Sequence, residues 1–189
     1  MNQLSPIDDF YADAARALHA RWSTLNMDDW LRPVAPFIAK QQGGRRVLDV
    51  GAGTGDLATE FAQAGCRVTA IEPVAEMWHA DLPRVEDRLP RLGKLRGPFD
   101  LVLCLSVLHH LPPADQTRAF RRMAELTRPG GTMILSTRHG PGPWRRWPIR
   151  AASLAAPGLS RIHKSRSPSI GAYNRREGVR WTWLVFRKS

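Results

Sequence analysis

The stretch VLDVGAGTGD, residues 47–56, places three glycines between two carboxylates, Asp49 and Asp56. Glycines at this spacing let a ligand approach bare backbone, and the start of a helix favours anions, so a dinucleotide is the first ligand to consider. The dinucleotide motif GxGxxG, however, needs a glycine where this chain has Asp56. A pyrophosphate would also meet a carboxylate on each side of the loop. The loop therefore favours a ligand with a positive centre and no phosphate, although Asp56 also suits capping of its helix.

Short apolar runs alternate with helical patterns around this loop. Strands are predicted at 45–50, 66–72, 99–108, 132–137 and 178–188, with helices at 56–65 and from 113 to a loop at 129–131. The run at 99–108 is almost entirely apolar, as in a strand covered on both faces. In the last strand, Trp181 and Trp183 are expected on one face. Strand and helix in alternation predict an α/β fold with a doubly wound, mostly parallel sheet.

Further helices are predicted outside the sheet. Residues 6–21 carry apolar side chains at helical spacing and follow a Ser-Pro pair that suits a helix start. A second helix, bent by its two prolines, is predicted at 28–40, and a short third helix is predicted at 151–156. Between the last strands, the segment RHGPGPWRRWPIR is rich in Gly, Pro, Trp and Arg and predicts a loop over the sheet edge.

The 189 residues carry a net charge of +11 that is unevenly placed. Residues 1–137 hold 16 Lys/Arg and 16 Asp/Glu, whereas 138–189 hold 12 Lys/Arg and a single acid, Glu177. Such a region attracts anionic partners, whether RNA, an acidic membrane surface or a phosphorylated small molecule. Because 24 of the 28 basic residues are arginine, a compositional bias of the genome is the simpler explanation.

Membrane and metal sites are not indicated. No segment approaches the roughly 20 apolar residues that span a bilayer, and the N-terminus lacks the basic-then-apolar order of a secretion signal. We therefore expect a cytoplasmic protein. Cys66 and Cys104 lie in apolar stretches without metal-ligand spacing, so buried, reduced thiols and no metal site are expected.

Four motifs, in this order and spacing, resemble the class I S-adenosylmethionine (SAM)-dependent methyltransferases: VLDVGAGTGDLA, the acid of VTAIEP, FDLVLCLSVLHHLPP and TRPGGTMILST. The resemblance implies a Rossmann-like, seven-stranded sheet with an antiparallel last strand and N-terminal capping helices. It implies one domain over 1–189, with a helical cap (1–42), a cofactor-binding core (43–137) and a basic C-terminal part that completes the sheet (138–189). SAM carries a sulfonium and an ammonium but no phosphate, which accounts for the acids around the loop.

The resemblance also implies residues for each part of the cofactor. The methionine portion would be lined by Asp49, Gly51, Ala52, Gly53, Leu105 and Ser106. Both ribose hydroxyls would be accepted by Glu72, and the adenine would contact Pro73, Val74, Asp87 and Arg88, with Asp81 as the alternative to Asp87. Tyr11 and Arg16 of the capping helix would close over the cofactor. The chain between Glu72 and Phe99 is shorter than the family's usual helix, strand and helix, and the segment after Gly140 is also trimmed.

Two adjacent histidines are the candidate catalytic residues. In methyl transfer the protein aligns the acceptor, excludes water and supplies a base where the acceptor must lose a proton. His109 and His110 follow the strand at 99–108, at the carboxyl edge where ligands bind in such sheets, and histidine titrates near neutral pH. The alternative is that one of them caps the following turn or packs under the sheet.

The methyl acceptor is predicted to be a small molecule. The apolar LSVL at 105–108 replaces the Asn/Asp-Pro-Pro-aromatic tetrapeptide of amino-group methylases, and no Pro-Cys pair offers a nucleophile for pyrimidine C5 methylation. Three alternatives stay open: an NAD enzyme, a non-catalytic cofactor-binding or scaffold protein, and an RNA-directed methyltransferase. The last would use Trp144, Trp147, Arg145, Arg146 and Arg150.

Overall fold

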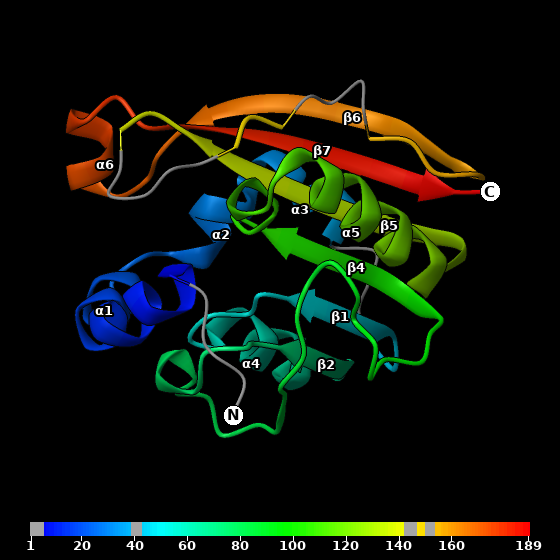
Figure 1. The fold of residues 1–189 in the computed structure, drawn as a ribbon, viewed down its shortest axis with the longest axis horizontal. Helices are drawn as coiled ribbons and strands as arrows, with labels where there is room; N and C mark the ends of the chain where they lie inside the picture. Colours follow the sequence, from blue (N-terminus) through cyan, green and yellow to red (C-terminus); the bar gives the residue numbers. More distant parts are fainter. Residues whose placement is uncertain (1–5, 39–42, 142–146, 150–153) are drawn as a thin grey trace.

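The computed structural model describes residues 6–38, 43–141, 147–149 and 154–189. One seven-stranded sheet, in the order β3-β2-β1-β4-β5-β7-β6, forms its centre (Figure 1). The strands are β1 Arg46–Val50, β2 Arg67–Ile71, β3 Arg84–Val85, β4 Phe99–Leu105, β5 Thr127–His139, β6 Leu159–Pro168 and β7 Arg180–Lys188. From β3 to β5 all neighbours are parallel, whereas β7 is antiparallel to β5 and to β6. The predicted doubly wound, mostly parallel sheet with an antiparallel last strand is confirmed.

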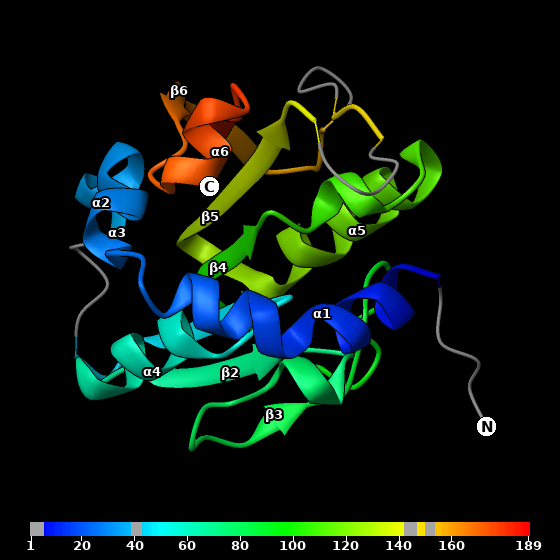
Figure 2. The same cartoon turned by 90° about the vertical axis from the view of Figure 1, so that its left-hand side faces the viewer.

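Helices lie on both sides of this sheet and at its carboxyl edge. They are α1 Pro6–Trp22, α2 Met27–Leu31, α3 Ala35–Ile38, α4 Asp56–Gln63, α5 Pro113–Leu126 and α6 Ala172–Arg176, with 3-10 turns η1 Arg32–Val34, η2 Ala75–Met77 and η3 Leu108–His110. Figure 2 shows α2 and α3 on one side of β4 and β5 and α5 on the other. In Figure 1 the arrow of β4 points toward the side on which α1 and α6 lie. Within the described residues, no helix is both long and apolar enough to cross a membrane.

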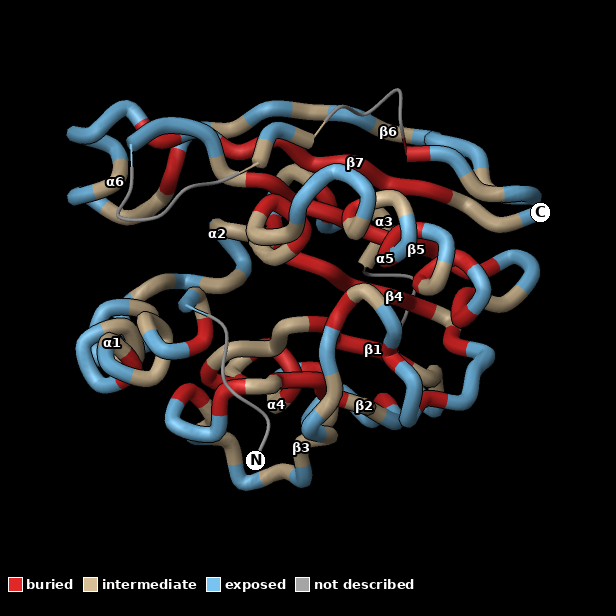
Figure 3. The backbone as a smooth tube through the Cα atoms, in the orientation of Figure 1, coloured by how far each residue is buried: buried red, intermediate tan, exposed pale blue. Residues whose placement is uncertain are grey.

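The central strands are buried on both faces, as the apolar run predicted (Figure 3). Alternate residues of β4 point to opposite faces: Leu101 and Leu103 join the cluster under α2 and α4, while Val102 and Cys104 join the cluster under α5. At roughly 25 cal/mol per Å² of apolar area, such strands supply much of the free energy of folding. This rigid sheet fixes the positions of the loops at its carboxyl edge.

Several predicted elements differ from the structure. The helix predicted at 28–40 is divided into α2, η1 and α3, because Pro33 and Pro36 lack the amide hydrogen that a continuous helix needs. The residues at 39–42 lie outside the described part. The strand predicted at 99–108 ends at Leu105, and the chain turns there into η3. The prediction of a helix at 151–156 is wrong over 154–156, because these residues form no helix. Residues 151–153 lie outside the described residues.

The C-terminal part holds two elements that the sequence did not predict, β6 and α6. Strand β6 is the polar edge of the sheet, and its side chains alternate between exposed and half-buried. Edge strands carry charge because it discourages pairing with other chains, and this composition hides their periodicity. The tryptophans of β7 do share one face: the rings of Trp181 and Trp183 lie 6.0 and 5.5 Å from that of Trp30 in α2.

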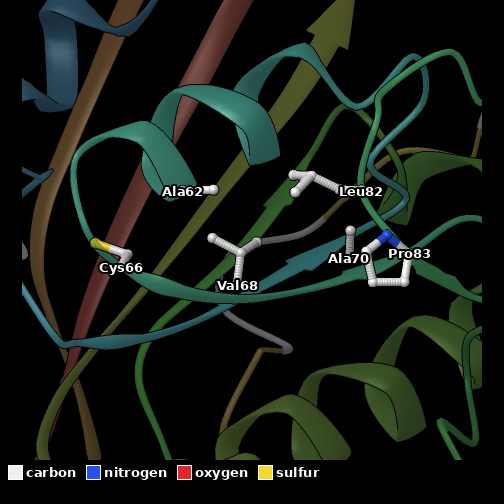
Figure 4. A pocket seen from close by; sticks show the side chains of 6 residues that line it. All are labelled: Ala62, Cys66, Val68, Ala70, Leu82 and Pro83. Atoms are coloured by element: carbon white, nitrogen blue, oxygen red, sulfur yellow. The ribbon is translucent and has the colours of Figure 1, made fainter.

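The connector between β2 and β4 is short, as the sequence indicated. Over 73–98 it contains η2 and the two-residue β3, and these residues, all described, form no α-helix. A small apolar cavity of about 180 Å³ lies between this connector, α4 and β2, lined by Ala62, Cys66, Val68, Ala70, Leu82 and Pro83 (Figure 4). None of the predicted site residues lines it. The candidate chemistry lies at the carboxyl edge instead.

Candidate functional site

The loop that opens the site joins β1 to α4. The amides of Gly51 and Ala52 both donate to the carbonyl oxygen of Ile71, at 2.8 and 2.9 Å, which fixes the loop against the end of β2. Ala52 therefore contributes to the loop through its backbone amide. The loop begins where β1 and β2, which pair in register from Arg46 to Val50, both reach the carboxyl edge.

The first two glycines let neighbouring side chains lie directly against the backbone of this loop. Gly51 and Gly53 adopt left-handed backbone, with φ of 72° and 58°. A Cβ at Gly51 would lie 2.4 Å from Cγ2 of Val107, and a Cβ at Gly53 would lie 3.2 Å from the ring of Trp22. The first separation excludes a side chain, the second is tighter than usual, and φ in this range favours glycine at both positions. Both positions therefore favour glycine, which leaves the loop as bare backbone.

The third glycine and the following aspartate have other roles. A Cβ at Gly55 would lie 2.5 Å from Cβ of Ala80, so this glycine allows the connector to pack on the loop. Asp56 accepts a hydrogen bond from the Thr54 hydroxyl at 2.9 Å and lies in the first turn of α4. The position of Asp56 thus agrees with the interpretation that it caps its helix.

Two buried carboxylates flank the glycines. Asp49 is 3% exposed and Glu72 is 6% exposed. The Glu72 carboxylate accepts the amides of Gly53 and Val74, both at 2.9 Å, which fixes it beside the loop. Burial, together with the charge of Glu72, raises the pKa of Asp49 to about 7, and burial raises that of Glu72 to about 7 against the opposing effect of those two amides. A pair of buried acids with raised pKa values favours a cationic ligand.

A third acid was not predicted from the sequence. Asp8, in the first turn of α1, is 6% exposed, and its charge raises the pKa of Glu72. Its Oδ2 accepts a hydrogen bond from NH1 of Arg88 at 2.8 Å. Arg88 therefore lies at the predicted adenine side, paired with the capping helix. Asp8 was missed because an acid after a helix-starting proline indicates a helix start and nothing more.

The aspartate predicted to take the adenine amino group stabilises a turn. The two carboxylate oxygens of Asp87 accept the amides of Arg88 and Lys94, both at 2.8 Å, so they hold the connector in shape. The alternative residue, Asp81, is exposed on the same connector. An adenine contact for Asp87 stays a prediction.

The inner face of α1 covers the segment that follows Glu72. Val74 and Met77 are both 2% exposed and form a small cluster with Ala15 of α1. Four partly buried residues of α1 pack against this cluster: Tyr11, Ala12, Leu18 and Trp22. Pro73 is half-buried between Glu72 and this cluster, and Arg16 is exposed on the helix. The predicted adenine wall and the predicted capping helix are thus in contact.

The end of β4 supplies the opposite side of the site. Ser106 follows Leu105 with φ of 65°, a left-handed conformation that non-glycine residues rarely adopt. Its amide lies 3.1 Å from both the carbonyl oxygen and the hydroxyl of Ser136 in β5. Strain of this kind costs of order 1–3 kcal/mol and is concentrated at functional sites. The turn brings Val107 against Gly51, so the predicted methionine-side residues come together here.

The two histidines differ in their surroundings. His109 is 2% exposed, and its Nδ1 lies 3.4 Å from the Thr137 hydroxyl, while its carbonyl oxygen accepts the Trp147 amide at 2.8 Å. His110 is half-buried, and its Nε2 lies 3.1 Å from the hydroxyl of Tyr11. The imidazole rings lie 4.4 Å apart. Tyr11, predicted as a cofactor residue, is thus placed at the candidate base.

Three further predictions concern RNA binding, the cysteine thiols and metal binding. Trp144, Arg145, Arg146 and Arg150, which the RNA interpretation used, lie outside the described residues. Burial raises the pKa of the Cys104 thiol to about 12, so that thiol is a poor nucleophile. Among the residues with described structure, no group of three or more His, Cys, Asp or Glu is arranged to hold a metal ion.

Comparison with known proteins agrees with this geometry. Residues 20–187 match a family model described as a methyltransferase domain. The ubiquinone biosynthesis O-methyltransferase of Bordetella avium is 31% identical over 154 residues, covering 69% of this chain and 61% of the relative. That of Albidiferax ferrireducens is 32% identical over 121 residues, covering 58% of this chain and 45% of the relative. The chain thus spans about half the length of these relatives.

The fold also has a close counterpart among solved structures. Magnesium protoporphyrin IX methyltransferase from Synechocystis PCC 6803, solved with bound SAM, superposes with a TM-score of 0.68 at 19% identity, covering 100% of both chains. The predicted Rossmann-like fold of this enzyme class is therefore confirmed. Because the family model spans most of the chain, the protein belongs to the methyltransferase domain family, the class I SAM-dependent methyltransferases.

Proposed function

We propose that this chain binds SAM at the glycine loop and transfers its methyl group to a small-molecule acceptor. The observation that carries this proposal is the pair of buried carboxylates, Asp49 and Glu72, beside two glycines with left-handed backbone. We further propose that the chain works as one domain, with 1–42 as the cap, 43–137 as the cofactor-binding core and 138–189 completing the sheet.

The residues suit the cofactor on its charge. SAM presents a sulfonium and an ammonium, and it supplies a methyl group bound to the cationic sulfur. Asp49 would face the positive methionine end, while Glu72, held by two amides, would accept hydroxyls of a ribose. Pro73 would offer an apolar wall with Val74 packed beneath α1, and Leu105, Ser106 and the loop 51–53 would close the methionine side. A dinucleotide fits poorly, because its pyrophosphate would lie against these acids.

On the acceptor side, we propose that His110 is the base and that Tyr11 orients it. The Tyr11 hydroxyl at Nε2 fixes the imidazole, and because Nδ1 of His110 is buried, the proton of the acceptor would reach Nε2 through this hydroxyl. His109 is buried against Thr137, so it supports the turn and the position of His110. The base would take a proton from the acceptor atom, and α1 would exclude water from it.

The proposed acceptor atom is a hydroxyl oxygen of a small molecule. Support comes from the relatives named as ubiquinone biosynthesis O-methyltransferases, and from a histidine base, which suits an acidic hydroxyl such as a phenol. No finding supports RNA as the acceptor. If the cofactor binds and no acceptor in a broad panel is methylated, that outcome would favour the scaffold interpretation.

The test is binding of S-adenosylhomocysteine (SAH), measured by thermal unfolding and calorimetry. A ligand that binds only the native state stabilises it by about 2.7 kcal/mol at 100 times Kd, which a domain of this size reports as a shift of several degrees. Glu72→Gln and Gly53→Arg should abolish the shift, whereas Glu76→Gln, at an exposed glutamate on η2, should retain it.

A wild-type protein that unfolds cooperatively with no shift would remove the proposal. A shift would justify a screen of phenolic acceptors, and Glu72→Gln covers the case in which Gly53→Arg fails to fold.

A further inference from the structure

Helix α1 is attached to the molecule by a small apolar contact. Its buried cluster, Ala15 with Val74 and Met77, is separate from the two clusters that cover the faces of the sheet. Figures 1 and 2 show α1 lying at the carboxyl edge, apart from α2, α3 and α5. Four partly buried residues of α1, Tyr11, Ala12, Leu18 and Trp22, complete this contact. Because only one α1 residue of the cluster is fully buried, polar contacts can add to how the helix is oriented over the site.

One polar contact at the start of α1 is the ion pair between Asp8 and Arg88. The Asp8 side chain is 9% exposed and that of Arg88 is 45% exposed, with 2.8 Å between Oδ2 and NH1. A carboxylate in the first turn is also favoured by the helix dipole. The connector presents Arg88 from a fixed position, because Asp87 accepts the amides of Arg88 and Lys94. Arg88 can therefore pair with α1 from a fixed backbone position.

Asp8 and Tyr11 lie three residues apart, so they share one face of α1. Through this face the helix reaches two different loops at the carboxyl edge: Asp8 contacts the connector after β3, and Tyr11 contacts His110 after β4. Rotation of α1 about its axis would break both contacts together. We propose that Asp8 and Arg88 are positioning residues, whose ion pair holds α1 across the cofactor site and thereby keeps the Tyr11 hydroxyl at His110. This inference rests on the proposed function, because its expected consequence is that the site retains the cofactor.

The test compares Asp8→Asn, Arg88→Gln and the double variant Asp8→Arg/Arg88→Asp, which reverses the charges. Three quantities are measured: hydrogen exchange of the amides over residues 6–22, the Cε1–H nuclear magnetic resonance signal of His110, and the dissociation rate of SAH. The measurements are made at pH 8.5, because loss of the Asp8 charge also lowers the pKa of Glu72, and at this pH Glu72 stays ionised in every variant. Arg32→Gln and Asp29→Asn, which break an ion pair within α2 and η1, are the matched controls.

Each single variant should speed exchange over α1, move the His110 signal in the direction produced by Tyr11→Phe, and speed SAH dissociation about tenfold. The charge reversal should return all three quantities most of the way toward wild type. Raising the salt concentration should speed dissociation from the wild type and leave Arg88→Gln unchanged, because the interaction that salt screens is then already absent. The α2 controls should match the wild type throughout.

Wild-type exchange and an unmoved His110 signal in both single variants would overturn the proposal. So would a charge reversal no better than the single variants, because that result indicates local packing at each position. The exchange and resonance measurements need no ligand. If they respond as expected while the wild type binds no SAH, the positioning role stands and the proposed cofactor is wrong.

Discussion

The hydroxyl of Tyr11 lies 3.1 Å from Nε2 of His110 and joins the first helix of the chain to the turn after β4. The residues are 99 positions apart, and their rings meet edge to face at 5.7 Å. Because Nδ1 of His110 is buried, a proton would reach this ring at Nε2, and the phenol that contacts Nε2 both orients the ring and can pass the proton to it. The contact therefore gives the capping helix a part in the proposed chemistry.

Tyr11→Phe should lower kcat by about 100-fold, within the range attributed to acid–base catalysis. SAH affinity should stay within about twofold of wild type, because the aromatic ring that packs from α1 against Val74 and Met77 remains. The rate of SAH formation with an acceptor from the phenol screen provides the measurement. Tyr173→Phe, at a tyrosine that is 54% exposed, is the control. Full activity combined with weak SAH binding would instead favour the predicted cofactor contact for Tyr11.

Gly51→Ala should destabilise the protein by about 2 kcal/mol more than Gly43→Ala. Both glycines have positive φ, 72° and 65°, so both substitutions carry the backbone strain of about 1 kcal/mol. At Gly51 the new Cβ also meets Cγ2 of Val107 at 2.4 Å, whereas Gly43 has nothing within 4 Å. Overpacking of this kind costs about 1–3 kcal/mol. Urea unfolding of the two variants measures the difference, and adding Val107→Ala to Gly51→Ala should recover most of it.

Trp30→Ala should lower the free energy of unfolding by about 2 kcal/mol, less than the 3–5 kcal/mol typical of a fully buried tryptophan. Trp30 is half-buried and packs edge to face on Trp181 and Trp183, so it attaches α2 to the last strand. Trp30→Phe retains an aromatic ring and should lose less than half as much, measured by urea unfolding. Equal losses in the two variants would contradict an aromatic contribution beyond buried area.

The fold and the cofactor side could be predicted from the sequence because local patterns carry them. The apolar run of β4 follows from burial on both faces, and the glycine loop follows from a close backbone approach that other residues cannot make. Asp49 and Glu72 could be placed because each lies within one residue of the end of a strand, and strand ends in a parallel sheet meet at one edge. These features depend on residues near each other in the chain.

The parts that could not be predicted depend on distant contacts. Pro129 and the two following glycines have the local character of a loop, yet β5 begins at Thr127 because that residue pairs with Phe99 of β4. Asp8 gains its importance from Arg88, 80 residues away. The polar β6 is recognisable as a strand only beside β7. No local pattern shows such pairings.

The raised pKa values of Asp49 and Glu72 predict how stability depends on pH. Each carboxyl has a pKa of about 7 in the folded protein, against ordinary values of 3.8 and 4.5. Between about pH 4 and pH 7 the folded protein therefore holds protons that the unfolded chain has lost. Because the folded state binds more protons in this window, the free energy of unfolding should fall as the pH rises through it. Urea unfolding across this range should show the decline, and Asp49→Asn should flatten it if the variant folds.

The same two acids predict that SAM binding releases protons. A cation placed beside them favours their charged forms, so near pH 7, where each is about half protonated, binding should expel up to about one proton in total. Calorimetry at pH 7 in phosphate and in Tris measures this release, because the released protons are taken up by buffers with different ionisation enthalpies. SAH lacks the sulfonium charge and should release fewer protons than SAM. Glu72→Gln should reduce the release, and Glu76→Gln should leave it unchanged. Equal binding enthalpies in the two buffers would mean that the carboxylates are already ionised without ligand and that the acids do not act as a charge-matched pair.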